Sequence, residues 1–127
     1  MSIVFHDFIS ARGENVIHAW LHGLGVKERQ KINSIIEHLE SEKNLSGSPF
    51  THKMDVTDHI FEVIADARGK AFRPLYFYGP EKGQATLVIG TEKKNDRLIP
   101  ANAIETAEKR RELVLTKRNE TVEHDIS

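Results

Sequence analysis

The middle of this 127-residue chain constrains its fold most, because three short apolar segments follow one another there with glycine-containing turns between them. Residues 60–67 alternate between apolar and polar side chains, which predicts a strand with one buried face. Residues 71–78 are largely apolar on both sides, as in a strand that is covered on two faces. Residues 84–91 alternate again, and the turns at 68–70 and 79–83 contain glycine, which adopts positive φ at little cost. The pattern predicts a three-stranded antiparallel meander.

The segments on either side of the meander predict helices that pack on it. Apolar residues recur at helical spacing in residues 16–24 and again in residues 26–42, with glycines at the joint, so we expect a helical hairpin. Residues 3–9 form an apolar run typical of a first strand, and a last helix begins near Pro100 and runs to about Lys117. The expected order is β-α-α-β-β-β-α. This is an α+β fold with a small antiparallel sheet and helices packed on one face.

Length and composition limit the chain to one domain and exclude several kinds of chemistry. We expect residues 1–118 to form a single core and residues 119–127, which hold three acidic side chains and no Lys or Arg, to be a flexible acidic tail. The absence of cysteine excludes disulfides, thiolate zinc sites and thiol nucleophiles. Neither a signal peptide nor a bilayer-spanning apolar run is apparent, so we expect a cytoplasmic protein without membrane association.

The net charge of −1 conceals an uneven distribution along the chain. Residues 1–58 carry 6 Lys and Arg against 8 Asp and Glu, whereas residues 59–118 carry 12 against 8. The positive charge is therefore concentrated in the meander and the last helix, which favours a surface that binds an anionic partner.

Three short motifs lie in this basic half, in the order Phe-Arg-Pro-Leu-Tyr (72–76), Gly-Thr-Glu-Lys-Lys (90–94) and Ile-Glu-Thr-Ala-Glu-Lys-Arg (104–110). Their order and spacing resemble the RelE/ParE toxin superfamily, in particular its phage-derived HigB-like branch, over roughly residues 3–115. The resemblance implies a RelE-like fold and the toxin of a type II toxin–antitoxin system. It implies an endoribonuclease that cleaves messenger RNA on the ribosome by attack of the 2′-hydroxyl on the neighbouring phosphate, without metal or cofactor. The implied partners are the ribosome, messenger RNA and a cognate antitoxin with a helix-turn-helix DNA-binding domain.

Six cations near the ends of the meander carry the roles that this resemblance implies. Arg73 lies in the middle of the first motif, and Lys93 and Lys94 end the second. These three are expected to be catalytic, because guanidinium and ammonium groups stabilise the charge that develops on phosphate oxygens. The RNA backbone is expected to be bound by three further cations, Arg68, Lys70 and Arg97.

The residues by themselves leave a structural alternative open for these cations. Arg73 interrupts an apolar strand, and alternation along the preceding strand places Glu62 and Asp66 where either can pair with it. Lys93 and Lys94 lie in a very polar segment that is equally typical of a solvated turn. Surface charge without a specific role is the alternative for the three RNA-binding cations.

Cleavage of this kind also needs a group that accepts the proton of the 2′-hydroxyl. The unperturbed pKa of histidine suits that role. His59 opens the meander and His52 lies in the connection before it, so each is a candidate general base. His124, near the end of the chain, is a weaker candidate. A purely structural role is the alternative for all three histidines.

Two positions depart from the family pattern. Many relatives carry an arginine where this chain has Ile64, which cannot hold a phosphate. Pro74 replaces an aliphatic residue and removes an N–H from a strand, so we expect a bulge or bend there. The absence of an arginine at position 64, together with the near-neutral net charge, favours an alternative hypothesis. In that hypothesis the protein is a non-catalytic protein-binding module, either a ParE-like gyrase inhibitor or a decayed phage-derived toxin.

Two further patterns are better explained by structure than by chemistry. His18 and His22 have the i, i+4 spacing of a zinc site, but the HExxH glutamate and a third ligand are missing. We therefore expect an exposed pair that flanks Trp20, and no metal site. Tyr76 and Tyr78 offer rings on which bases can stack, but their strand position predicts core packing.

Overall fold

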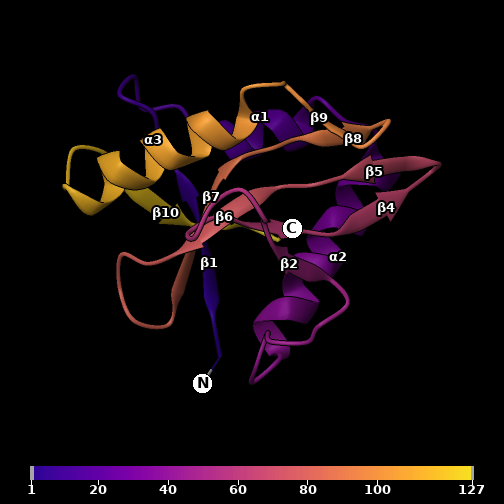
Figure 1. Ribbon diagram of the computed structural model, residues 1–127, viewed down its shortest axis with the longest axis horizontal. Coiled ribbons are helices and arrows are strands. Elements are labelled where there is room, and N and C mark those ends of the chain that lie inside the picture. The colour runs from indigo at the N-terminus through magenta and orange to yellow at the C-terminus, as the bar shows by residue number, and fades with distance from the viewer. Residues whose placement is uncertain (1, 127) are drawn as a thin grey trace.

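The computed structural model describes residues 2–126, which form three helices and ten strands (Figure 1). The helices are α1 (Val16–His22), α2 (Val26–Ser41) and α3 (Ala103–Leu115). The strands are β1 (Val4–Phe8), β2 (Thr51–Lys53), β3 (Phe61–Val63), β4 (Ala65–Ala67), β5 (Lys70–Phe72), β6 (Leu75–Tyr78), β7 (Gln84–Ile89), β8 (Glu92–Lys94), β9 (Arg97–Ile99) and β10 (Thr121–Glu123). The α+β class is confirmed. Within the described residues, no helix combines the length and apolar composition needed to cross a bilayer.

The strands form two sheets, where the sequence analysis expected one small antiparallel sheet. One sheet has six strands in the order β10-β1-β7-β6-β3-β2, and the other has four in the order β4-β5-β8-β9. The six-stranded sheet is also not purely antiparallel, because β1 runs parallel to β7. The expected element order is therefore only partly right.

The meander is divided between the two sheets because two of its three predicted strands break. The first breaks at Ile64, giving β3 and β4, and the second breaks at Arg73 and Pro74, giving β5 and β6. Proline has no N–H for a ladder hydrogen bond, and the β6–β7 register shifts immediately afterwards, between Leu75 and Tyr76. The irregularity expected near Pro74 is confirmed.

An unexpected hairpin completes the four-stranded sheet. The segment that reads as a polar turn forms β8 and β9, which are joined at Asn95 and Asp96. Both of these residues have positive φ, 51° and 61°, and asparagine and aspartate tolerate this region best among non-glycine residues. The Asn-Asp pair was the sequence signal for this hairpin.

Helices cover both faces of the six-stranded sheet, so the expectation that they pack on one face is wrong. α1 and α2 pack on the face that carries Tyr76 and Leu87, whereas α3 packs on the face that carries Leu75 and Phe77. In Figure 1, α2 and α3 accordingly lie on opposite sides of the central strands. The reason is that β6 is apolar on both faces, and a second apolar face needs its own cover.

The segment that we expected to be a flexible tail contributes a strand. β10 pairs antiparallel with β1, with Asp7 opposite Val122. His124 follows directly and is buried, with Nδ1 2.7 Å from Asp7 Oδ1 and Nε2 2.8 Å from Asn33 Oδ1. One histidine thus ties β10 to β1 and α2. Met1 and Ser127, which belong to the expected domain and tail, lie outside the described residues.

Candidate functional site

Cross-strand pairing in the four-stranded sheet decides which cations share a face. Asp66 pairs with Ala71, Ala71 with Lys93, and Lys93 with Leu98, so the side chains of these residues lie on one face. Lys94 pairs with Arg97 on the other face, and its Nζ is 3.6 Å from Glu92 Oε2. The structure therefore separates the two neighbouring lysines that the sequence analysis grouped.

Arg73 is held between two carboxylates. Its Nη1 lies 2.9 Å from Asp66 Oδ1 and its Nε lies 3.5 Å from Glu62 Oε1. Nη1 also donates to the carbonyl oxygen of Phe72 at 2.8 Å. The pairing of Arg73 with Glu62 or Asp66, which the sequence left open as the structural alternative, is confirmed for both partners. The guanidinium is thereby fixed in place, and its side chain is only 12% exposed.

Glu62 connects Arg73 to one of the candidate bases. His52 lies directly opposite Glu62 in the β2–β3 pair, and its Nδ1 is 3.2 Å from Glu62 Oε2. The Glu62 side chain is 8% exposed, and its Oε1 accepts no hydrogen bond from any described residue. His52, Glu62, Arg73 and Asp66 thus form a continuous row of charged and polar groups, which we call the charged cluster.

The charged cluster borders a cleft of about 420 Å³, which we call the Glu62 cleft. Glu62, Lys93 and Arg97 line it, and the N-terminal part of α3 contributes Ile104. The cleft therefore brings the buried Glu62 carboxylate and Lys93 together beside α3, and Arg97 borders it from the opposite face of the β8–β9 hairpin. Two exposed carboxylates, Asp55 and Asp96, also line the cleft, and apolar side chains, among them Met54 and Leu98, complete its wall.

The other sequence-predicted residues lie apart from this cleft. Arg68 and Lys70, in the β4–β5 hairpin, border a different depression beside the start of α2, where Lys70 Nζ is 3.9 Å from Glu28 Oε2. His59 is exposed, and its backbone N–H donates to Thr57 Oγ1 at 3.2 Å. Of the six predicted cations, only Lys93 and Arg97 line the Glu62 cleft, and Arg73 adjoins it through its ion pair with Glu62.

The structure also places the remaining histidines. Both ring nitrogens of His124 are engaged by Asp7 and Asn33 on the α1/α2 side of the sheet, so His124 does not reach the charged cluster. The rings of His18 and His22 lie 4.0 Å apart between centroids. Among residues 2–126, no group of three or more acidic or histidine side chains is arranged to hold a metal ion.

Glu62 is the functional candidate that the sequence analysis did not select. It was considered only as a partner for Arg73, because alternation placed it on the polar face of its strand. The missing signal was burial, since a buried glutamate beside cations, with an oxygen that accepts no hydrogen bond, is an arrangement in which a carboxylate acts as an acid or base. Periodicity alone does not show that α3 and β9 close over this position.

Comparison with known families matches residues 19–112, which is most of the chain, to the model described as "Phage derived protein Gp49-like (DUF891)". The matched range contains the whole charged cluster and every residue that lines the Glu62 cleft. Neither the search of curated proteins nor the search of solved structures gave a match.

Proposed function

Because this chain belongs to the family of phage-derived Gp49-like proteins, we propose that it is the toxin of a type II toxin–antitoxin pair and a ribosome-dependent mRNA endonuclease. The HigB-like motifs of the sequence support this assignment. The proposed reaction is attack of a ribose 2′-hydroxyl on the adjacent phosphate, with release of the 5′-oxygen of the next nucleotide. It uses no metal and no cofactor.

The observation that carries the proposal is the buried carboxylate of Glu62, whose Oε1 is ion-paired with Arg73 but accepts no hydrogen bond, at a cleft that Lys93 and Arg97 also line. In the proposed mechanism Glu62 Oε1 accepts the proton of the 2′-hydroxyl. Lys93 stabilises the negative charge on the phosphate oxygens, and Arg97 binds the RNA backbone. His52, held against Glu62, is the proposed acid for the leaving 5′-oxygen.

The Glu62–Arg73 pair couples proton transfer to charge stabilisation. In the resting state, the carboxylates of Glu62 and Asp66 compensate the charge of Arg73. When Glu62 takes the proton, it becomes neutral, and part of the positive potential of Arg73 is no longer compensated. The positive potential of Arg73 therefore increases as negative charge develops on the phosphate. At that point a positive group stabilises the transition state most strongly. This coupling gives Arg73 its catalytic role although it is ion-paired before the reaction.

The partners and compartment follow the same proposal. The antitoxin, with its helix-turn-helix DNA-binding domain, would inhibit the toxin by covering the Glu62 cleft. The ribosome would present the messenger RNA in the cytoplasm. Arg68, Lys70 and Lys94, which lie outside the cleft, are then contacts for the RNA backbone of the ribosome or messenger.

A non-catalytic protein-binding module, either ParE-like or a decayed toxin, is the second candidate. The observation that favours it is the double ion pair of Arg73, which leaves this guanidinium without an excess charge. Ile64, which is half-buried and stands where relatives carry arginine, also favours this candidate. This candidate predicts tight binding to one protein and no RNA products.

Purified, partner-free protein is expected to cut messenger RNA on stalled ribosomes. Glu62→Gln keeps the shape of the side chain but removes the base, so the cleavage rate should fall by about 10²–10⁴-fold. Glu81→Gln, in the exposed β6–β7 turn, is the matched control and should cut like the wild type. Circular dichroism verifies that each variant is folded. A folded Glu62→Gln protein with full activity would exclude Glu62 as the base, and wild type without products would favour the protein-binding module.

A further inference from the structure

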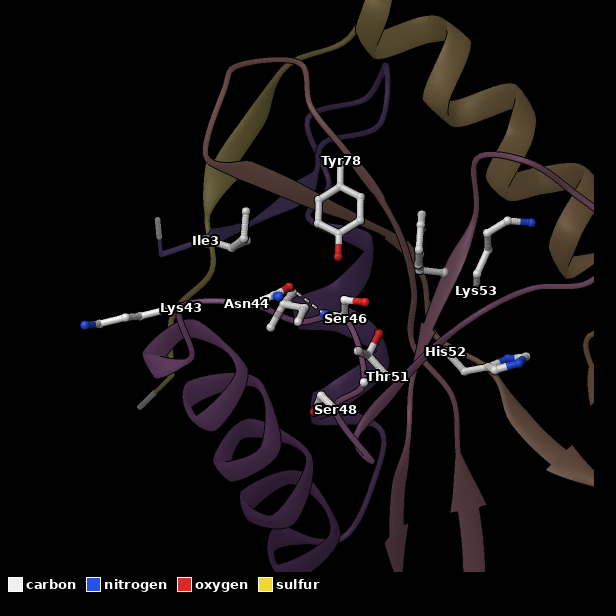
Figure 2. A pocket seen from close by; sticks show the side chains of 12 residues that line it. Ile3, Lys43, Asn44, Ser46, Ser48, Thr51, His52, Lys53 and Tyr78 are labelled. Carbon is white, nitrogen blue, oxygen red and sulfur yellow. Dashed lines mark hydrogen bonds between the residues drawn. The ribbon is translucent and has the colours of Figure 1, made fainter.

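A second and larger hollow lies on the other side of the edge strand β2 from Glu62. Its volume is about 710 Å³, which is in the range of sites that bind small molecules. The loop after α2 forms one wall with Asn44 and Ser46, and the ends of β3 and β6 form the other wall with Phe61 and Tyr78 (Figure 2). We call it the Tyr78 pocket. The proposed mechanism does not use it.

The interior of the Tyr78 pocket combines aromatic rings with neutral polar groups. The rings of Phe61 and Tyr78 meet edge to face, with centroids 4.8 Å apart. The Tyr78 hydroxyl points into the pocket toward the loop that carries Asn44 and Ser46 (Figure 2). Aromatic faces beside amide and hydroxyl groups are the surroundings in which proteins stack and hydrogen-bond unpaired nucleobases.

A buried network holds the polar side of this pocket. The Thr51 hydroxyl lies 2.5 Å from the hydroxyl of Tyr76, which is 3.5 Å from that of Tyr78. Burial raises the pKa of Tyr76 far above its usual value, so this phenol stays neutral. Thr51 also donates to the carbonyl oxygen of Glu62 at 3.0 Å. The donors and acceptors of the pocket are therefore in place before a ligand arrives.

The rim of the Tyr78 pocket is cationic. Lys43 and Lys53 border it, and both side chains extend away from its centre (Figure 2), where Lys53 Nζ donates to the carbonyl oxygen of Thr57 at 2.9 Å. None of the described residues that line it is acidic, although the chain as a whole has a net charge of −1. A ligand with an aromatic, hydrogen-bonding body and a phosphate at its edge matches this distribution.

The edge strand β2 links this pocket to the Glu62 cleft. β2 has three residues and lies at the end of the six-stranded sheet. Thr51 and Lys53 border the pocket, and His52 between them borders it too while its ring contacts Glu62. Alternation along β2 and β3 places Glu62 and the pocket on opposite faces of the sheet at this edge, so an RNA strand that reaches both passes around β2.

We propose that the Tyr78 pocket binds the base of the RNA nucleotide adjacent to the cleaved phosphate and so sets the nucleotide preference of cleavage. This inference rests on the proposed function, because it assigns the pocket to the same RNA substrate. Tyr78 and Phe61 provide the stacking surface, and Asn44 and Ser46 read the edge of the base. Lys53 and His52 hold the backbone as it crosses β2.

Titration with nucleoside monophosphates tests binding without requiring cleavage. AMP, GMP, CMP and UMP are each added in the millimolar range to the partner-free full chain, and amide chemical shifts are followed by nuclear magnetic resonance. We expect saturable shifts in residues 43–48 and 51–53, with affinities that differ among the four bases. Tyr78→Ala, at a 43% exposed side chain, should weaken binding about tenfold or more, since stacking is worth about 1–3 kcal/mol per base. Val122→Ala, at a similarly exposed position on β10, should not.

Cleavage patterns test specificity separately. Tyr78→Ala should still cut messenger RNA but lose the base preference of the wild type at the positions next to the cut. Glu62→Gln should lose cutting and keep nucleotide binding. Absence of saturable shifts with all four nucleotides, shifts that map elsewhere, or an unchanged preference in Tyr78→Ala would overturn the inference. If the wild type cuts no RNA, the titration alone decides, so the pocket and the proposed activity can fail independently.

Discussion

At the scale of single residues, the alternation of one short strand assigns different surroundings to Lys93 and Lys94. Lys93 lines the Glu62 cleft, whereas Lys94 faces the opposite side and pairs with Glu92. The sequence predicted that cations gather at the end of the meander, but it did not show which of the two lysines lines the cleft of Glu62. That choice depends on the β8–β9 hairpin, whose strands are too short for periodicity to reveal.

Neutralising each of these lysines in turn tests the assignment. Lys93→Met removes the cation that is proposed to stabilise phosphate charge, so the cleavage rate should fall on the order of 100-fold. Lys94→Met has the same chemistry on the other face and should change the rate by less than about threefold, as for an exposed backbone contact. The measurement is the rate of messenger cleavage on stalled ribosomes. Equal losses in the two variants would contradict the placement of Lys93 at the reaction centre.

At the scale of elements, α1 is positioned on the sheets by a contact that glycine makes possible. A Cβ atom at Gly90 would lie 1.8 Å from Trp20 Cδ2, so the indole occupies the place of a side chain just after β7. The same indole meets Phe72 of β5 edge to face, with centroids 6.2 Å apart. Trp20 thus spans the junction between the two sheets, where Glu62 and Arg73 also meet on the opposite face.

Gly90→Ala should destabilise the protein because the new methyl group must displace the indole. Overpacking of this kind typically costs about 1–3 kcal/mol, measured as the free energy of unfolding in urea. Gly23→Ala is the matched control, since its Cβ would lie 3.4 Å from the nearest atom and its φ is −81°. Adding Trp20→Leu to Gly90→Ala should restore part of the loss. A stability equal to that of the wild type would show that α1 does not need this close approach.

The helices were predictable from the sequence, whereas the breaks in the strands were predictable only in part. Helical spacing identified α1, α2 and α3 because each keeps an apolar stripe over two turns or more. Pro74 predicted the irregularity in the second strand of the meander, but no residue in 60–67 predicted that the first strand breaks at Ile64. That break arises from tertiary structure, since β3 continues the six-stranded sheet while β4 leaves it to pair with β5. Local periodicity does not encode such a change of partner.

At the scale of the whole molecule, the six-stranded sheet is completed by strands from the two ends of the chain. β1 lies between β7 and β10, and His124 joins it to α2 through Asp7 and Asn33. The acidic composition of residues 119–126 gave no sign of strand β10, because the residue that fixes it is the single buried polar side chain of His124 and not an apolar pattern. Membership in the Gp49-like family confirms the phage-derived branch of the resemblance, whereas the RelE-like fold itself stays a prediction.

His124→Ala should loosen this last strand. Removing one partner of a buried hydrogen-bonded pair leaves the Asp7 carboxylate with less compensation, which typically costs about 3 kcal/mol. We expect faster hydrogen exchange at the amides of β10 and β1 and a lower free energy of unfolding. His59→Ala, at an exposed position, serves as the control. Unchanged exchange at residues 121–123 would show that backbone pairing alone holds β10.

The pairing of β1 with β10 also has a consequence for the order in which the domain can fold. Every residue that lines the Glu62 cleft precedes β10 in the sequence, so the cleft residues are synthesised before the strand that pairs with the outer edge of β1. The nascent domain therefore keeps an open sheet edge until residues 121–124 emerge and His124 reaches Asp7. An unpaired sheet edge can pair with another chain, so the docking of β10 closes the edge at which the unfinished domain would otherwise associate.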